Sequence, residues 1–305
     1  MIEGVLDILH PPKKVNAQYD LPYKQVYRLE ERPTSPSCIA IDIHNYCNAK
    51  CDMCPIFHYS PLIPKGKMPF DLFRRIIDEY RSLGGGAVTF CQNGEMFVLP
   101  EALEYIKYVV LQNLSTYIVT NASLLDPKKT DLLIKMGFNG NIYVSFHGIN
   151  KSTYEKTTGL NYGRTLRNIN YLIKKYQRVK FIRSLSHNFE SREREKVERY
   201  WNRRGIPVMF DQTHTWAGAM NTSVSVASKI QGCIQPLNQM CIDFNGDVYL
   251  CCIDLLKQFI VGNITESSIY KVWNGRVFTE ILEAIFNNAV SDDFLCRKCH
   301  AVIRG

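Results

Sequence analysis

Residues 39–54 read IAIDIHNYCNAKCDMC, and this stretch decides the fold that we expect. Its first five residues are rich in Ile and predict a β-strand. A loop follows at once and carries Cys47, Cys51 and Cys54 in the spacing Cys-x3-Cys-x2-Cys. In sheets built from β-then-α units, loops in this position are where the chemistry takes place.

The β-then-α pattern continues from this strand to about residue 215. Further strands are predicted at 87–91, 116–120, 142–146, 179–185 and 206–210, and helices at 70–83, 101–112, 127–136, 164–176 and 192–203. Six such units predict an α/β fold whose parallel sheet has right-handed crossovers and is either open or curled into a partial barrel.

Composition narrows the class of protein. The 305 residues are 46% hydrophobic and 22% charged, which suits one large domain or a large domain with a small one. No apolar run reaches the roughly 18 residues of a membrane span, and the N-terminus lacks a signal peptide, so we expect a cytoplasmic protein without membrane contact. The net charge of +8 comes from scattered basic residues, so no nucleic-acid partner is expected, and an anionic substrate is the less favoured alternative.

The cysteine content points to metal or redox chemistry. Eleven cysteines without a secretion signal argue against a disulfide scaffold. Three thiolates in a tight loop suit a 4Fe–4S cluster, because they bind three of the four irons and leave one open. Zinc is the alternative, with His44 or His58 as its fourth ligand.

The Cys47–Cys54 loop after the first strand resembles the signature of the radical S-adenosylmethionine (SAM) superfamily. That resemblance implies a partial (β/α)6 TIM-like barrel in which SAM binds the open iron. One-electron cleavage of SAM then yields a 5′-deoxyadenosyl radical, which removes hydrogen from an unactivated carbon.

Other positions resemble the cofactor-binding segments of the same superfamily. Asn93-Gly94-Glu95 is similar to its Gly-Gly-Glu segment, in which Glu95 would accept from the SAM ammonium; the alternative is an ordinary turn. The implied cofactor contacts are Met53, Asn93, Gly94, Glu95, Asn121, Ser145 and Arg183. Met53 replaces the usual aromatic residue near the adenine, and Arg183 has the alternative of pairing with a carboxylate.

The pattern changes after residue 216. Residues 240–244 and 247–251 flank Asn245-Gly246 and predict a β-hairpin. Helices are predicted at 268–274 and 278–287, and a short helical segment at 262–264 leads to Trp273. These elements would bring together Cys233, Cys251, Cys296 and Cys299, which on spacing alone suit zinc or an iron–sulfur cluster.

This C-terminal pattern resembles the SPASM/twitch branch of the superfamily, and the absence of further cysteines favours the one-cluster twitch form. The resemblance therefore implies two 4Fe–4S clusters in all, and a flavodoxin- or ferredoxin-type reductant. We expect an N-terminal extension at 1–36, a partial barrel at 37–220 and an auxiliary-cluster module at 221–305.

Four cysteines remain after the two sets. Cys38, Cys91 and Cys241 suit core positions, whereas Cys252 adjoins a predicted cluster ligand and resembles the hydrogen donor of some epimerases. We therefore expect epimerisation of a small sugar, aminoglycoside or aminocyclitol-like substrate. The alternatives are dehydrogenation of an alcohol with the auxiliary cluster as electron acceptor, peptide maturation and a non-catalytic electron carrier. The short N-terminal extension argues against a peptide leader-binding domain.

Overall fold

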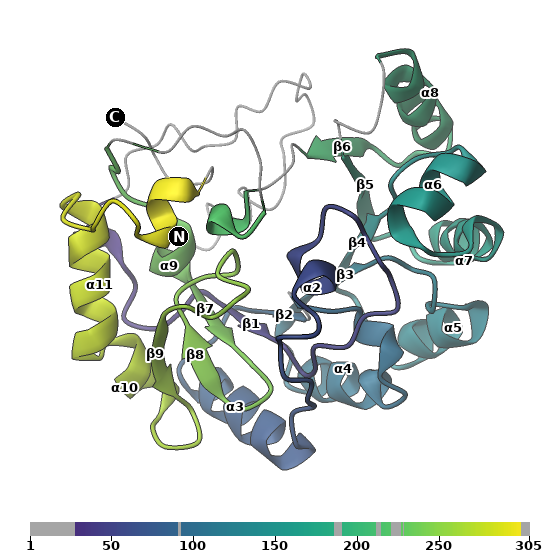
Figure 1. Cartoon of the computed structure of the whole chain (residues 1–305). Coiled ribbons are helices and arrows are strands. Elements are labelled where there is room, and N and C mark those ends of the chain that lie inside the picture. The colour runs from purple at the N-terminus through teal and green to yellow at the C-terminus, as the bar shows by residue number, and fades with distance from the viewer. Residues whose placement is uncertain are drawn as a thin grey trace.

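A computed structural model describes residues 28–90, 93–185, 191–211, 215–220, 227 and 229–299. The core is a curved sheet with helices packed on its outer side (Figure 1). Its strands are β1 Cys38–Ile41, β2 Ala87–Phe90, β3 Ser115–Thr120, β4 Asn141–Ser145, β5 Val179–Leu185, β6 Val208–Asp211, β7 Gln239–Ile242, β8 Asp247–Tyr249 and β9 Ile260–Asn263.

The strand order is β6-β5-β4-β3-β2-β1-β7-β8-β9, and all pairs from β1 to β6 are parallel. Alternate residues face opposite sides of the sheet. On β1, Ile39 and Ile41 join the large core under the helices, whereas Cys38 and Ala40 face the inner side. The parallel α/β core predicted from the six repeated units is thus confirmed, as a partial TIM-like barrel.

The helices of the described residues are α2 Pro55–His58, α3 Phe70–Ser82, α4 Ala102–Leu111, α5 Pro127–Lys135, α6 Lys151–Thr158, α7 Tyr162–Lys175, α8 Ser191–Asn202, α9 Gln235–Asn238, α10 Ile269–Trp273 and α11 Arg276–Phe286, with 3-10 turns η2 Leu29–Glu31, η3 Met96–Val98, η5 Trp216–Gly218 and η6 Leu295–Lys298. Helices α3, α4, α5 and α7 lie on the outer side of the curved sheet, whereas α2 lies in the loop that follows β1 (Figure 1). Polar side chains cap the N-termini of three helices: Asp126, Asn150 and Asn161 accept hydrogen bonds from backbone amides in the first turns of α5, α6 and α7.

The C-terminal hairpin continues the barrel sheet. Strand β7 pairs in parallel with β1, and β8 and β9 follow antiparallel. One prediction here is wrong: Gly262 and Asn263 belong to strand β9 and not to a helical segment. The Gly262 backbone packs so closely on Val272 of α10 that an added Cβ would lie 2.7 Å from that side chain.

Helix α6 is the main element that the sequence pattern missed. Its eight residues bury only Tyr154, Thr157 and Thr158, which is too few for a clear apolar stripe. Among the described residues, no helix is long and apolar enough to cross a membrane. Cys91, predicted to be a core residue, lies outside the described residues.

Candidate functional site

The loop that carries the first three cysteines begins just beyond β1 and ends where Cys54 caps α2. The end of α6 holds this loop: the amides of Lys50 and Asp52 donate to the carbonyls of Thr158 and Thr157, at 2.8 and 3.2 Å. Gly159 then ends α6 with a left-handed φ of 68°, close to the Lys50 side chain. The helix that the sequence pattern missed therefore positions the cysteine loop.

The three thiols of this loop lie within electrostatic range of one another. Burial raises the pKa of Cys51 first, and the neighbouring charges of Cys54 and Cys47 add to the effect. Cys47 is an exposed residue, but protein surrounds its thiol and raises its pKa to about 11. The ten described cysteines are all free, so no disulfide engages these thiols.

His44 is a structural residue of this loop. Its Nδ1 accepts from the amide of Tyr46 at 3.0 Å, so its Nε2 carries the proton and donates to the Met96 carbonyl at 3.2 Å. His58 Nε2 contacts the Asp52 carbonyl at 2.6 Å.

The described residues contain no group of three His, Cys, Asp or Glu side chains arranged to hold a single metal ion. Cubane cysteines bind different irons and need not converge on one point.

Glu95 is a buried carboxylate beside the cysteine loop. It accepts hydrogen bonds from the Thr120 hydroxyl at 2.6 Å, the Asn121 amide at 2.7 Å and the Phe97 amide at 3.3 Å. Burial raises its pKa above the ordinary value, against the effect of these donors. None of the ion pairs among the described residues includes Glu95. One acceptor position on Oε2 is left, and a cationic ligand would complete it.

Gly94 and Asn121 fasten the Glu95 region to the cysteine loop. A Cβ on Gly94 would lie 2.6 Å from the Tyr46 carbonyl, and the next amide, of Glu95, donates to that carbonyl at 2.9 Å. Asn121 Nδ2 donates to Asn48 Oδ1 at 3.2 Å. The glycine therefore permits a close approach between two segments of the chain itself.

Asn93 faces a polar network that the sequence did not reveal. Its side-chain and backbone N–H groups donate to the Asp42 carboxylate, which also accepts from the Tyr249 hydroxyl at 3.0 Å. Asn93 Oδ1 is buried and has no hydrogen-bond partner within the described part of the chain. The network joins Asp42, the residue directly after β1, to the loop that follows β2 and to strand β8, where the C-terminal hairpin meets the barrel.

The remaining predicted cofactor residues lie on different elements. Ser145 ends β4 and pairs in register with Arg183 in the middle of β5; both are half-buried. Met53 lies in the cysteine loop, and its carbonyl accepts from the indole N–H of Trp216 at 3.3 Å. Sequence reasoning did not single out Trp216, because a lone aromatic residue in an unpatterned segment carries no signal.

Four buried cysteines from distant segments meet in the C-terminal region: Cys233 before α9, Cys251 after β8, and Cys296 and Cys299 around η6. Burial is the largest cause that raises the pKa of Cys251, and the charges of Cys252, Cys296, Cys299 and Cys233 raise it further. The structure therefore brings the second set of predicted ligands together.

Cys252 occupies the inner side of the sheet. It packs against Ala40, Cys241 and Tyr249, is half-buried, and has Gln235 Oε1 as a weak partner at 3.9 Å. Burial and the nearby Cys299 raise its pKa to about 12, while the charge of Arg183 acts in the opposite direction. Cys38 and Cys241 are buried in β1 and β7, as predicted.

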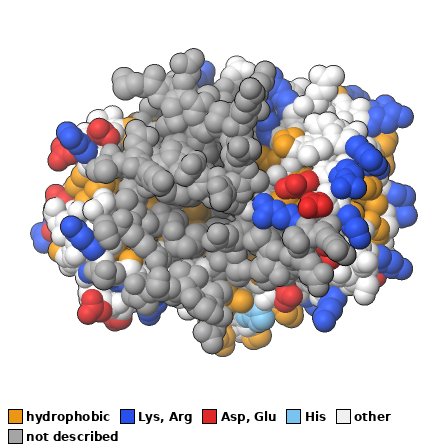
Figure 2. Space-filling model, turned by 90° about the horizontal axis from the view of Figure 1, so that it is seen from above, with side chains coloured by type: hydrophobic (Ala, Val, Ile, Leu, Met, Phe, Trp, Pro, Cys, Tyr) orange, Lys and Arg blue, Asp and Glu red, His pale blue; other side chains and the backbone are white. Residues whose placement is uncertain are grey.

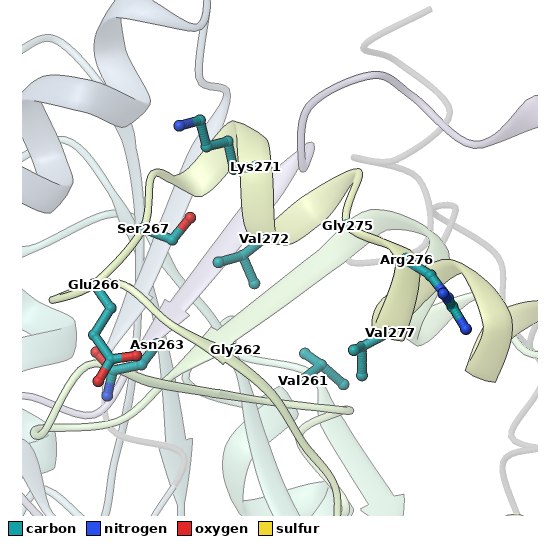
Figure 3. Close-up of a pocket in the computed structure, with 10 residues that line it drawn as sticks. All are labelled: Val261, Gly262, Asn263, Glu266, Ser267, Lys271, Val272, Gly275, Arg276 and Val277. Atoms are coloured by element: carbon teal, nitrogen blue, oxygen red, sulfur yellow. The ribbon is translucent and has the colours of Figure 1, made fainter.

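A surface groove of about 280 Å³ lies apart from both cysteine sets, between β9, α10 and the start of α11 (Figure 3). Its Lys271 and Arg276 side chains point to opposite sides, so their charges do not converge. In the top view, Lys and Arg side chains lie on both sides of the molecule, with Asp and Glu side chains near some of them (Figure 2).

Comparison with known proteins identifies the class. Residues 41–200 match the radical SAM superfamily and residues 233–300 match SPASM, an iron–sulfur cluster-binding domain. The chain belongs to the radical SAM superfamily.

Individual relatives are more distant. The chain is 23% identical to the S-adenosyl-L-methionine-dependent 2-deoxy-scyllo-inosamine dehydrogenase of Niallia circulans, over 87% of this chain and 93% of that protein. The structure of BtrN in complex with AdoMet and 2-DOIA is similar, with 18% identity, a TM-score of 0.60 and coverage of 87% and 92%. Streptococcus suis SuiB bound to S-adenosylmethionine is 17% identical with a TM-score of 0.61, over 92% of this chain and 77% of SuiB.

The two matched domains imply a 4Fe–4S cluster and SAM. The chain's own groups fit both. Free thiols within electrostatic range of one another suit iron, and the buried Glu95, which has no ion-pair partner among the described residues, suits the ammonium of SAM.

Proposed function

We propose that this radical SAM enzyme inverts a carbon of a small ring substrate that bears hydroxyl or amino groups. The observation that carries the proposal is the position of Cys252, a half-buried free thiol on the inner side of the sheet, next to Cys251 and in electrostatic range of Arg183. Cys252 would supply the returning hydrogen atom. When bound, SAM and the clusters supply one-electron chemistry and a 5′-deoxyadenosyl radical.

The proposed ligand assignments follow the two cysteine sets. Cys47, Cys51 and Cys54 would hold the first cluster, and Cys233, Cys251, Cys296 and Cys299 a second, fully ligated one. Met53, Asn93, Gly94, Glu95, Asn121, Ser145 and Arg183 would line the SAM and substrate side. Residues 37–220 and 221–305 would form the barrel and the auxiliary module.

The proposed inversion exchanges one hydrogen atom for another at the same substrate carbon. Transfer of a hydrogen atom from the substrate carbon to the 5′-deoxyadenosyl radical would give 5′-deoxyadenosine and leave a carbon radical on the substrate. The S–H bond of Cys252 breaks, and a C–H bond forms on the opposite face. The sulfur radical left on Cys252 takes one electron and one proton, with a flavodoxin- or ferredoxin-type protein as the electron source.

Dehydrogenation is the second candidate, and the Niallia circulans relative favours it. In that reaction the same substrate radical would lose a proton to solvent and one electron to the second cluster, and a ketone would form. Cys252 would then only pack beside a cluster ligand. The structures of SuiB, including one bound to the precursor peptide SuiA, keep peptide modification as a third and less favoured candidate.

Isotope incorporation separates these reactions. With 2-deoxy-scyllo-inosamine and related aminocyclitols as probes, epimerisation in D2O should place one deuterium at the inverted carbon, because thiol protons exchange with solvent. Cys252→Ala should still cleave SAM but form no epimer. Cys241→Ala is the matched control, since it removes a thiol from the same apolar cluster and should retain epimerisation. A product two hydrogens lighter, formed equally well by Cys252→Ala, would refute epimerisation.

A further inference from the structure

A short turn at residues 215–219 lies between the two cysteine loops. On one side, the indole N–H of Trp216 donates to the Met53 carbonyl at 3.3 Å. On the other, the Thr215 hydroxyl donates to the Lys298 carbonyl at 2.6 Å. Each accepting carbonyl belongs to the residue directly before a predicted cluster ligand, Cys54 in one loop and Cys299 in the other.

The first loop has a second contact with this turn. The Tyr59 hydroxyl, just after α2, donates to the Ala219 carbonyl at 2.8 Å. The second loop also packs closely on it, since a Cβ on Gly218 would lie 2.6 Å from Lys298 Cδ. The turn is therefore in contact with both loops through side chains and backbone.

The backbone of this turn is strained. Trp216, Ala217 and Gly218 follow one another with φ values of 49°, 53° and 89°. Left-handed geometry is costly for residues with a Cβ, and such residues persist only where the surroundings hold them. Internal hydrogen bonds close the turn, from the amides of Gly218 and Met220 to the Thr215 carbonyl at 3.0 and 3.1 Å.

We propose that Thr215 and Trp216 are positioning residues that tie the two cysteine loops together, so that the environment of one cluster depends on the other loop. The proposal rests on the proposed function only in taking both loops as cluster loops. Because Thr215 and Trp216 are adjacent in one strained turn, releasing either end frees the other, and each loop then moves independently.

The test removes the hydrogen bond of the turn to each loop separately. Thr215→Val removes the hydroxyl, and Trp216→Phe removes the indole N–H but keeps an aromatic ring. Trp201→Phe is the matched control, because the buried indole N–H of Trp201 has no acceptor among the residues that the structure describes. Tyr59→Phe provides a milder variant if either change prevents folding.

Two measurements test whether the two cysteine loops are coupled. Amide hydrogen exchange of the ligand-free protein should rise about fivefold in both loops, 51–57 and 296–299, for either variant, as expected for the loss of one hydrogen bond. The double variant should add little to the single ones. In the reconstituted protein, Thr215→Val should also shift the reduction potential of the first cluster, and Trp201→Phe should not.

Effects confined to the loop next to each substitution, or fully additive effects, would overturn the proposal. A wrong proposed function and a wrong coupling of the two loops would give different results. Absence of an epimer or of a second cluster would refute the function, whereas the exchange measurement needs neither substrate nor iron.

Discussion

The substitution Glu95→Gln separates cofactor binding from folding. Oε1 of Glu95 accepts two of its three hydrogen bonds, from Thr120 and Phe97, and a glutamine oxygen can keep both. The amide NH2 then replaces Oε2, where it faces the Asn121 amide and the position left for a cationic ligand. Two donors oppose one another there, and the negative charge is lost.

The expected loss of SAM affinity follows from these contacts. A hydrogen bond to a charged group contributes about 1.5–3 kcal/mol, so the Kd for SAM should rise about 10- to 150-fold. The melting temperature of the ligand-free protein should change little. The variant loses the Asn121 contact but no longer buries a carboxyl group whose pKa burial has raised.

Isothermal titration of the anaerobically reconstituted protein measures this Kd. Glu101→Gln is the control, because Glu101 is an exposed carboxylate paired with Lys67 and should leave the affinity unchanged. An unchanged Kd in a folded, iron-loaded Glu95→Gln protein would show that the segment from Asn93 to Glu95 is only a turn.

Two further predictions concern the supports of the site. Gly94→Ala places a Cβ 2.6 Å from the Tyr46 carbonyl, so the free energy of unfolding, measured with denaturant, should fall by about 1–3 kcal/mol. Gly163→Ala is the control, because its added Cβ would lie 3.6 Å from the nearest described atom, and it should not destabilise the protein. Burial raises the pKa of Asp42, so the folded protein keeps a proton that the unfolded chain has lost, and stability falls as pH rises from the ordinary Asp pKa of 3.8 toward the raised value. Asp42→Asn has no carboxyl group to titrate, so the difference between its free energy of unfolding and that of the wild type should increase by about 1.4 kcal/mol per pH unit in that window. A difference that stays constant with pH would contradict the reasoning.

The parallel sheet could be predicted because its strands are short β-branched runs between amphipathic helices. The same local patterns failed for α6, whose sequence KSTYEKTT has no apolar period, and for β9, a four-residue strand that contains Gly262 and Asn263. Both elements depend on packing: α6 on the cysteine loop and β9 on β8.

The cysteine sets could be found because their spacing carries the signal. The residues that hold the cysteine loops in place could not be found in this way. Asp42 reads as a polar residue at the end of a strand, and only the fold brings Tyr249 to it across 207 residues. Trp216 likewise acquires a role only when the chain places it beside Met53, 163 residues earlier.

The central claim is that the first cysteine loop carries the cluster at which SAM is cleaved. The most direct measurement is 5′-deoxyadenosine formation by the reduced, anaerobically reconstituted protein, together with its iron content. The account predicts cleavage and about eight irons per chain, from two cubanes of four irons each. Changing Cys47, Cys51 and Cys54 together to Ala should abolish cleavage and leave about four irons. Undiminished cleavage in that triple variant would contradict it.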